Sequence, residues 1–136
     1  MVHVKDVLKS MDYGPSPEGA EHVASWLDTH KAGFGHFIDG RFTAPSKGKA
    51  LNVTNPADGK MLATVSDGTA EDIDRAVAAA ARAFRSWSKL AGHERAKYLY
   101  AIARNIQKRD RFLAVLETMD NGKPIRETLA ADIPLA

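Results

Sequence analysis

The sequence has 136 residues, of which 44% are hydrophobic and 26% are charged, and its formal net charge is +2. This balance is typical of one globular domain, and so small a charge does not favour a nucleic-acid or membrane surface. The absence of cysteine excludes disulfides, zinc–thiolate sites and a thiolate nucleophile from this stretch. Neither a signal peptide nor an apolar run of about 18 residues is visible, so we expect a cytoplasmic protein.

Residues 1–32 are interpreted as an N-terminal helical extension. Apolar residues between Val4 and Met11 recur at helical spacing, which predicts a short first helix. A second helix is expected to have Ser16 as its N-cap and Pro17 in its first position, and to end near Lys31–Gly33. Its apolar face consists of Val23, Trp26 and Leu27.

Residues 36–65 are expected to form short antiparallel strands. Asp39–Gly40 separates two apolar runs, and an Asp-Gly pair in this place favours a type I′ hairpin, which needs positive φ at both residues. Alternating apolar and polar residues predict two further strands at 50–54 and 61–65. The stretch Asn55–Gly59 between them is typical of a turn.

From Thr69 onward the pattern is helical. Thr69 and Asp72 resemble a capping box at the start of a long helix. A second helix is expected from about Glu94, a third from Asp110, and a last short one over 125–131 after Pro124. The first of these helices has one apolar stripe, formed by Ile73, Val77, Ala80, Phe84 and Trp87. In the second, Leu99, Ile102 and Ile106 are predicted to face inward, and the apolar residues of the third are Phe112, Leu113, Leu116 and Met119.

Two patterns that suggest a binding site are rejected. His22, His30 and His36 lack both the i, i+4 spacing and the carboxylate partner of a metal site, so exposed or hydrogen-bonded histidines are the simpler interpretation. The glycines at 33 and 35 precede a predicted strand rather than a helix. They also lack the third glycine of a phosphate-binding loop.

The segment Lys89–Arg111 is the one feature that favours nucleic-acid binding. Its basic residues are Lys89, Arg95, Lys97, Arg104, Lys108, Arg109 and Arg111. Arg104, Lys108 and Arg111 follow helical spacing on the face opposite the predicted apolar residues. No aromatic platform accompanies the basic residues. A solvated helix face is therefore the preferred interpretation. Read from its residues alone, the chain is an α+β piece without a catalytic constellation.

Several stretches resemble the aldehyde dehydrogenase superfamily, in the order in which that family places them. They are Phe37–Phe42, Val53–Gly59, Leu62–Val65, Thr69–Trp87, Glu94–Ala96 and Leu116–Pro124. Three more stretches are similar to family 16 of these enzymes, namely Met11–Glu18, Trp26–Asp28 and Asp132–Ala136. The resemblance implies an α/β superfamily in which residues 33–136 begin a Rossmann-like NAD-binding domain. In this segment we expect short antiparallel hairpins and three to four helices after the N-terminal extension.

The resemblance implies an NAD(P)-dependent enzyme that oxidises aldehydes to carboxylic acids, with NAD or NADP as cofactor. In this family a cysteine attacks the aldehyde and a glutamate activates the hydrolytic water. No residue here matches that machinery, which the family places beyond Ala136. We therefore expect this N-terminal segment to be inactive alone, with the rest of the chain as its partner and no partner among nucleic acids or membranes.

The resemblance also implies two possible site features. A monovalent cation would be held by the carbonyls of Val53 and Thr54 and by the carboxylate of Asp120, with an ordered helix end as the simpler role of Asp120. Leu135 matches a position at the aldehyde entrance, where core packing is the simpler interpretation. We also expect a homo-oligomer, because the amphipathic helices have no sheet here to cover them. A non-catalytic scaffold or oligomerisation module is the alternative function.

Overall fold

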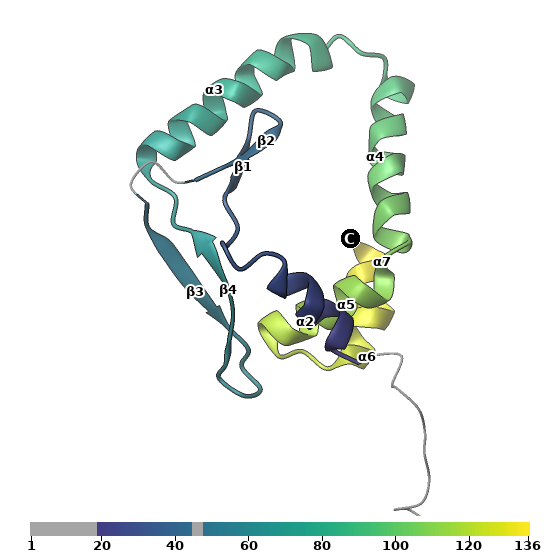
Figure 1. Ribbon diagram of the computed structural model, residues 1–136. Helices are drawn as coiled ribbons and strands as arrows, with labels where there is room; N and C mark the ends of the chain where they lie inside the picture. Colours follow the sequence, from purple (N-terminus) through teal and green to yellow (C-terminus); the bar gives the residue numbers. More distant parts are fainter. Residues whose placement is uncertain (1–18, 45–47) are drawn as a thin grey trace, which may run out of the picture.

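The computed structural model describes residues 19–44 and 48–136 (Figure 1). The first predicted helix and the predicted cap at Ser16 and Pro17 lie outside these residues. The elements in chain order are α2 (Glu21–Asp28), β1 (His36–Ile38), β2 (Arg41–Thr43), β3 (Ala50–Thr54), β4 (Met61–Ser66), α3 (Ala70–Trp87), α4 (Gly92–Gln107), α5 (Asp110–Asn121), α6 (Ile125–Glu127), a π-helical turn (Thr128–Asp132) and α7 (Ile133–Leu135). None of the described helices is long and apolar enough to cross a membrane.

The two strand pairs form as the sequence predicts. β1 pairs antiparallel with β2 through a turn in which Asp39 and Gly40 have φ angles of 56° and 78°. This is the left-handed region that a type I′ turn requires. β3 pairs antiparallel with β4, and an isolated parallel bridge between Phe34 and Val65 joins the segment after α2 to this second sheet.

The start of α3 confirms the predicted capping box. The Thr69 hydroxyl accepts the Asp72 N–H at 3.3 Å, and Asp72 Oδ2 accepts the Thr69 N–H at 2.9 Å. Asp72 is almost fully buried and also accepts a hydrogen bond from Arg75. A reciprocal cap satisfies two backbone donors that a free helix start leaves unpaired, so this helix begins where local chemistry dictates.

The elements are arranged as an open arc (Figure 1). α3 runs along its top, α4 descends along one side and the β3–β4 pair lies on the other side. The helices α2 and α5–α7 cluster at the base, and the β1–β2 hairpin lies inside. The hairpin is tied to α3 by an ion pair between Arg82 Nη2 and Asp39 Oδ2 at 3.2 Å. The C-terminus lies within the arc, near α4 and α7.

Most of the buried side chains lie where α2 and the π-turn pack against α5. Val23, Ala114 and Val115 are buried there, and Thr128 is fully buried. The Thr128 hydroxyl lies 3.0 Å from Thr118 Oγ1, 3.2 Å from the Ala114 carbonyl and 3.1 Å from the Ile125 carbonyl. A buried hydroxyl with these partners avoids the cost of lost hydration.

The C-terminal helical path is longer than predicted. The prediction ended it at residue 131, whereas the π-turn and α7 continue it to Leu135. The Ile133 N–H bonds the Thr128 carbonyl, one residue further back than in an α-helix. This wider turn immediately precedes Pro134, which has no N–H donor and whose ring would clash with a regular helical ladder.

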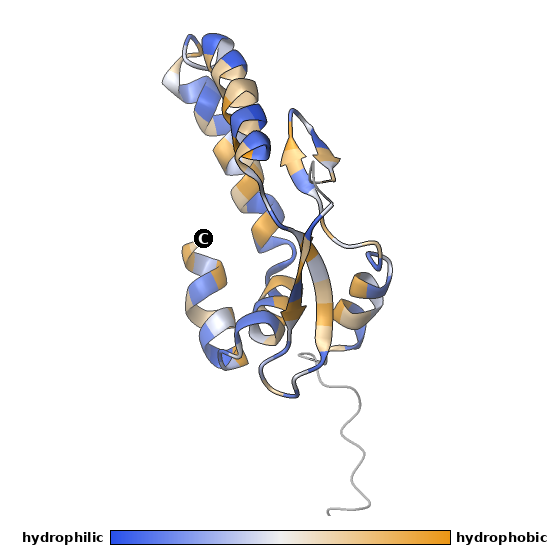
Figure 2. Cartoon of the chain, turned by 90° about the vertical axis from the view of Figure 1, so that its left-hand side faces the viewer, coloured by the Kyte–Doolittle hydropathy of each residue, from blue (hydrophilic) through white to orange (hydrophobic). Residues whose placement is uncertain are grey.

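The apolar faces of α3 and α4 are mostly not covered within this chain, which agrees with the expectation that no sheet is present here to cover them. The prediction that Leu99 and Ile102 face inward is wrong within this chain. Phe84, Leu99 and Ile102 remain 63%, 64% and 58% exposed. Figure 2 shows hydrophobic and hydrophilic segments interleaved along these helices. The two helices meet at their junction, where the rings of Trp87 and Tyr98 lie 5.3 Å apart. Periodicity identifies an apolar stripe but does not supply the surface that covers it.

Candidate cation site between β3 and α5

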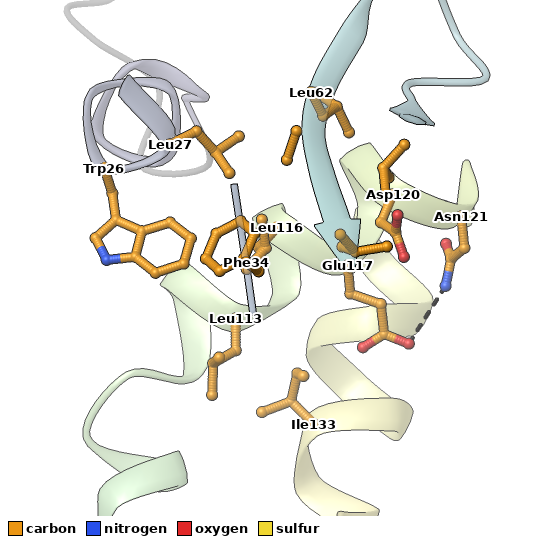
Figure 3. Close-up of a pocket in the computed structure, with 13 residues that line it drawn as sticks. Trp26, Leu27, Phe34, Leu62, Leu113, Leu116, Glu117, Asp120, Asn121 and Ile133 are labelled. Carbon is orange, nitrogen blue, oxygen red and sulfur yellow. Dashed lines mark hydrogen bonds between the residues drawn. The ribbon is translucent and has the colours of Figure 1, made fainter. Parts of the chain in front are cut away.

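An open, mainly apolar pocket of about 570 Å³ separates the β3–β4 pair from the helical cluster (Figure 3). α2, α5 and α7 form its helical walls, and Phe34 lies between α2 and the strands. Its lining residues are Trp26, Leu27, Phe34, Val53, Leu62, Ala63, Val65, Leu113, Leu116, Glu117, Asp120, Asn121 and Ile133.

The polar side of the pocket comes from the last turn of α5. Glu117, Asp120 and Asn121 follow i, i+3, i+4 spacing, which places them on one helix face. Glu117 Oε1 accepts a hydrogen bond from Asn121 Nδ2 at 3.4 Å. The exposed Asp120 carboxylate makes no hydrogen bond or ion pair with any described residue. None of the residues that line the pocket is basic, so this wall has an excess of negative charge.

The opposite wall contains an irregularity in the strand ladder. Val53 pairs with Ala63 and Thr54 pairs with Met61, so Leu62 is an extra residue on β4. A bulge of this kind interrupts the ladder and changes where neighbouring backbone groups point. The interruption falls between Val53 and Thr54, the two residues whose carbonyls the sequence analysis assigned to a cation.

The two walls are joined by a close contact at the end of α5. Gly122 caps the helix with φ 76°, and its N–H donates to the Thr118 carbonyl at 2.9 Å. A Cβ at Gly122 would stand 2.8 Å from Pro56 Cγ. The proline of the β3–β4 turn therefore lies directly against the helix end that carries Asp120. This arrangement brings the predicted residues Val53 and Asp120 to the same pocket.

The donor set suits a hard cation and not a transition metal. Carboxylate and carbonyl oxygens are the ligands that such ions prefer. Among residues 19–44 and 48–136 no group of three or more His, Cys, Asp or Glu side chains is placed to hold a metal. Asp120 is the only carboxylate in the ligand set that the sequence analysis assigned.

Leu135, predicted at the aldehyde entrance, lies at the end of α7 and is 85% exposed. Core packing, the simpler interpretation of this residue, does not hold within this chain.

His30 Nδ1 lies 2.9 Å from both Thr29 Oγ1 and the Trp26 carbonyl, which agrees with a hydrogen-bonded histidine. His36 Nε2 is buried without a hydrogen-bond partner, 3.9 Å from Asp72 Oδ2.

Part of the basic segment makes hydrogen bonds or ion pairs with nearby residues. Lys97 Nζ lies 2.8 Å from Glu94, and Arg104 donates to Gln107 at 2.8 Å. Arg95 donates to the Leu90 carbonyl. These contacts within one helix and its preceding turn fit a solvated helix face.

The sequence analysis missed two features of this region. It did not assign Glu117 and Asn121, whose spacing relative to Asp120 shows a shared helix face but not a pocket. It also missed the ion pair between Lys123 and Asp132, in which Nζ lies 2.7 Å and 2.6 Å from the two carboxylate oxygens. This hydrogen bond to Asp132 raises the pKa of the Lys123 ammonium above its usual value. It fixes the segment after α5 to the π-turn.

Comparison with known proteins places this architecture. The family model described as "Aldehyde dehydrogenase family" matches residues 42–136. An aldehyde dehydrogenase of Deinococcus radiodurans is 44% identical over 108 residues, which are 79% of this chain and 21% of that protein. An acetaldehyde dehydrogenase of Pseudomonas aeruginosa is 45% identical over the same shares of the two chains.

Solved structures agree with the sequence relatives. HpcC from Thermus thermophilus superposes with a TM-score of 0.80 at 31% identity, over 91% of this chain and 24% of that one. Betaine aldehyde dehydrogenase from Staphylococcus aureus, solved in complex with NAD⁺, has a TM-score of 0.73 at 36% identity, over 80% and 22%. The chain therefore belongs to the aldehyde dehydrogenase family. It spans about one fifth of the length of the curated relatives that it matches.

Proposed function

We propose that this chain is the opening part of an NAD(P)-dependent aldehyde dehydrogenase that oxidises aldehydes to carboxylic acids. Residues 33–136 would begin its NAD-binding domain, and residues 1–32 would be an N-terminal helical extension. The observation that carries the proposal is the family match over 42–136, supported by a structural relative solved with NAD⁺. When bound, NAD or NADP accepts the hydride that leaves the aldehyde carbon.

The contribution of this stretch is support and not covalent chemistry. It contains no cysteine, so the thiolate that attacks the aldehyde must come from outside it. Leu135, exposed at the end of α7, is the residue proposed to border the aldehyde entrance. Its apolar side chain would contribute contact area and no charge.

The test is aldehyde-dependent NADH formation, measured for the full-length protein beside this chain alone, with NAD and NADP and several aldehydes. We expect activity in the full-length protein and none in the chain. Full-length protein that forms no NADH or NADPH with any aldehyde would contradict the enzymatic proposal. Replacing Leu135 with Ala should change the KM for a bulky aldehyde more than the KM for a small one.

Two finer assignments belong to this proposal. The stretches Met11–Glu18, Trp26–Asp28 and Asp132–Ala136 support membership of family 16. We also propose a cytoplasmic location, which agrees with membership of the aldehyde dehydrogenase family. Fractionation of cells that express the full-length protein tests the second assignment, and recovery in a membrane or secreted fraction would contradict it.

We further propose that the pocket wall formed by β3 and α5 holds a monovalent cation. The ligands would be the carbonyls of Val53 and Thr54 and the carboxylate of Asp120. The support is the unpartnered Asp120 carboxylate, the bulge opposite Val53 and Thr54, and the lack of a basic side chain around the pocket. Since a ligand that binds the native state raises its stability, the thermal midpoint should increase with K⁺ or Na⁺. Asp120→Asn should reduce that increase.

We also propose that the chain self-associates through the exposed apolar faces of α3 and α4. Exposed apolar surface favours association, and Phe84, Leu99 and Ile102 contribute to it here. Sedimentation analysis of the chain should show a dimer or larger species. Leu99→Lys together with Ile102→Lys should shift it towards the monomer. A wild-type chain that stays monomeric at high concentration would contradict the proposal.

A further inference from the structure

The contact between Gly122 and Pro56 joins two segments that are 66 residues apart in sequence. Gly122 has φ 76°, and a Cβ there would lie 2.8 Å from Pro56 Cγ and 3.5 Å from Pro56 Cβ. Heavy atoms of real side chains do not approach as closely as the first of these distances. The structure therefore needs glycine at this position twice, for its backbone conformation and for the space beside the proline.

Neither partner of this contact has freedom to move away. The turn that carries Pro56 is closed by the Asn55 N–H donating to Lys60 and by the Gly59 N–H donating to Asn55, each at 2.8 Å. The Asn55 side chain also accepts the Ala57 N–H at 2.9 Å. A proline ring in such a turn cannot swing aside as a long side chain does.

The helix side is equally constrained. Asn121 Oδ1 accepts the Lys123 N–H at 2.8 Å, and the Lys123 ammonium is paired with Asp132. The segment that follows Gly122 is thus fixed to the π-turn. A side chain added at Gly122 would have to separate α5 from the β3–β4 turn as a whole.

We propose that Gly122 and Pro56 are positioning residues of the cation site, because their contact sets the distance between Asp120 and the Val53–Thr54 end of β3. The inference depends on the cation site proposed above. Asp120 precedes Gly122 by two residues in the same helical turn, so a shift of the helix end carries its carboxylate with it. Metal–oxygen distances tolerate deviations of about 0.2 Å, which is less than the displacement that a 2.8 Å contact demands.

The experiment measures the thermal midpoint of the full-length protein against K⁺ concentration, with choline added to keep ionic strength constant. The variants are Gly122→Ala, Pro56→Ala, the double variant, and Gly40→Ala as the matched control. Gly40, in the β1–β2 turn, also has positive φ, at 78°, but nothing lies within 4 Å of a Cβ there. Gly40→Ala therefore introduces a similar backbone strain without the steric contact and outside the turn that carries Pro56.

Gly122→Ala should weaken the apparent K⁺ affinity by about 10- to 100-fold, the effect typical of residues that orient metal ligands. Gly40→Ala should lower the midpoint but leave its K⁺ dependence as in the wild type. Pro56→Ala should weaken the K⁺ affinity by itself, because the helix end loses its support. The double variant should bind K⁺ better than Gly122→Ala, since the smaller residue at 56 leaves room for the new methyl group.

Three outcomes would overturn the inference. The first is a Gly122→Ala variant with the K⁺ response of the wild type. The second is an equal loss of response in Gly40→Ala. If Gly122→Ala does not fold, an unchanged K⁺ response in Pro56→Ala decides against it. A wild-type protein that does not respond to K⁺ or Na⁺ overturns the cation site together with its positioning residues, and leaves the aldehyde dehydrogenase activity to be judged by NADH formation.

Discussion

The α3–α4 arm (Ala70–Trp87 and Gly92–Gln107) and the helical cluster of α2 and α5–α7 are built on different principles. The arm contains the two longest helices, of 18 and 16 residues, yet most of its large apolar side chains remain exposed. The cluster has shorter helices but contains Val23, Ala114, Val115 and Thr128, all buried. Local signals are thus enough to define the arm, whereas packing holds the cluster.

The two regions should differ most in how much stability they lose when a valine is replaced by aspartate. Val115→Asp places an unpaired charge at a position that is 4% exposed and should cost about 3–5 kcal/mol. Val77→Asp on α3, at a position 62% exposed, should change the unfolding free energy by no more than about 0.5 kcal/mol. Urea unfolding of the two variants measures both values. Equal losses would show that the arm is packed as tightly as the cluster.

Removing the hydroxyl of Thr128 should cause the next largest loss of stability. Thr128→Val keeps the shape but removes the group that contacts Thr118 Oγ1 and the Ala114 carbonyl, and should cost about 1–3 kcal/mol. Thr29→Val is the control, because its hydroxyl donates to Trp26 at an exposed position. Thermal unfolding followed by circular dichroism compares the two. A stable Thr128→Val would mean that packing alone fixes the π-turn.

Within the arm, the cap of α3 should make the largest contribution to stability among the interactions between residues close in sequence. Thr69→Ala removes the hydroxyl that accepts the Asp72 N–H and should cost about 1 kcal/mol. Ser88→Ala, at the other end of the same helix, is the control and should have little effect. Helical content measured against temperature distinguishes the two variants. If both behave alike, the capping box does not define where the arm starts.

We expect the ion pair between Lys123 and Asp132 to make the smallest contribution to the free energy of unfolding, and this contribution should depend on pH. The pKa of Lys123 is raised above 10.5 in the folded state, chiefly by the hydrogen bond to Asp132. Its contribution to stability is therefore fully present below pH 10.5 and is lost as pH rises through the folded-state pKa. The wild type should lose more stability than Lys123→Met in this alkaline range. Identical pH profiles would show that the pair contributes nothing, as many exposed pairs do.

Local sequence chemistry predicted the parts of the fold that short-range interactions decide. The Asp39–Gly40 turn needs only two residues that tolerate positive φ, and the capping box at Thr69 needs only a residue three positions later. The end of the chain was predicted less well. The π-turn depends on how Thr128 packs against α5 and on Pro134 in the next turn, and no periodic pattern encodes that combination.

The candidate site, too, was predicted only in part from the sequence. The resemblance assigned Val53, Thr54 and Asp120, and the pocket brings Val53 and Asp120 together. Glu117 and Asn121 were missed because a polar helix face is ordinarily solvated, and nothing in the sequence marks this one as a pocket wall. The contact of Gly122 with Pro56 was also missed, since a glycine after a helix is already explained by its cap.

By itself, the sequence determined the identity of each strand and of the long helices, the chemistry of their caps and turns, and the family resemblance. These depend on interactions between residues a few positions apart. Only the tertiary structure decided which apolar stripes are covered, where the π-turn falls, and that a proline of one turn meets a glycine 66 residues later. The reason is that burial and contact depend on partners distant in sequence, and the pattern of a single helix or strand carries no record of them.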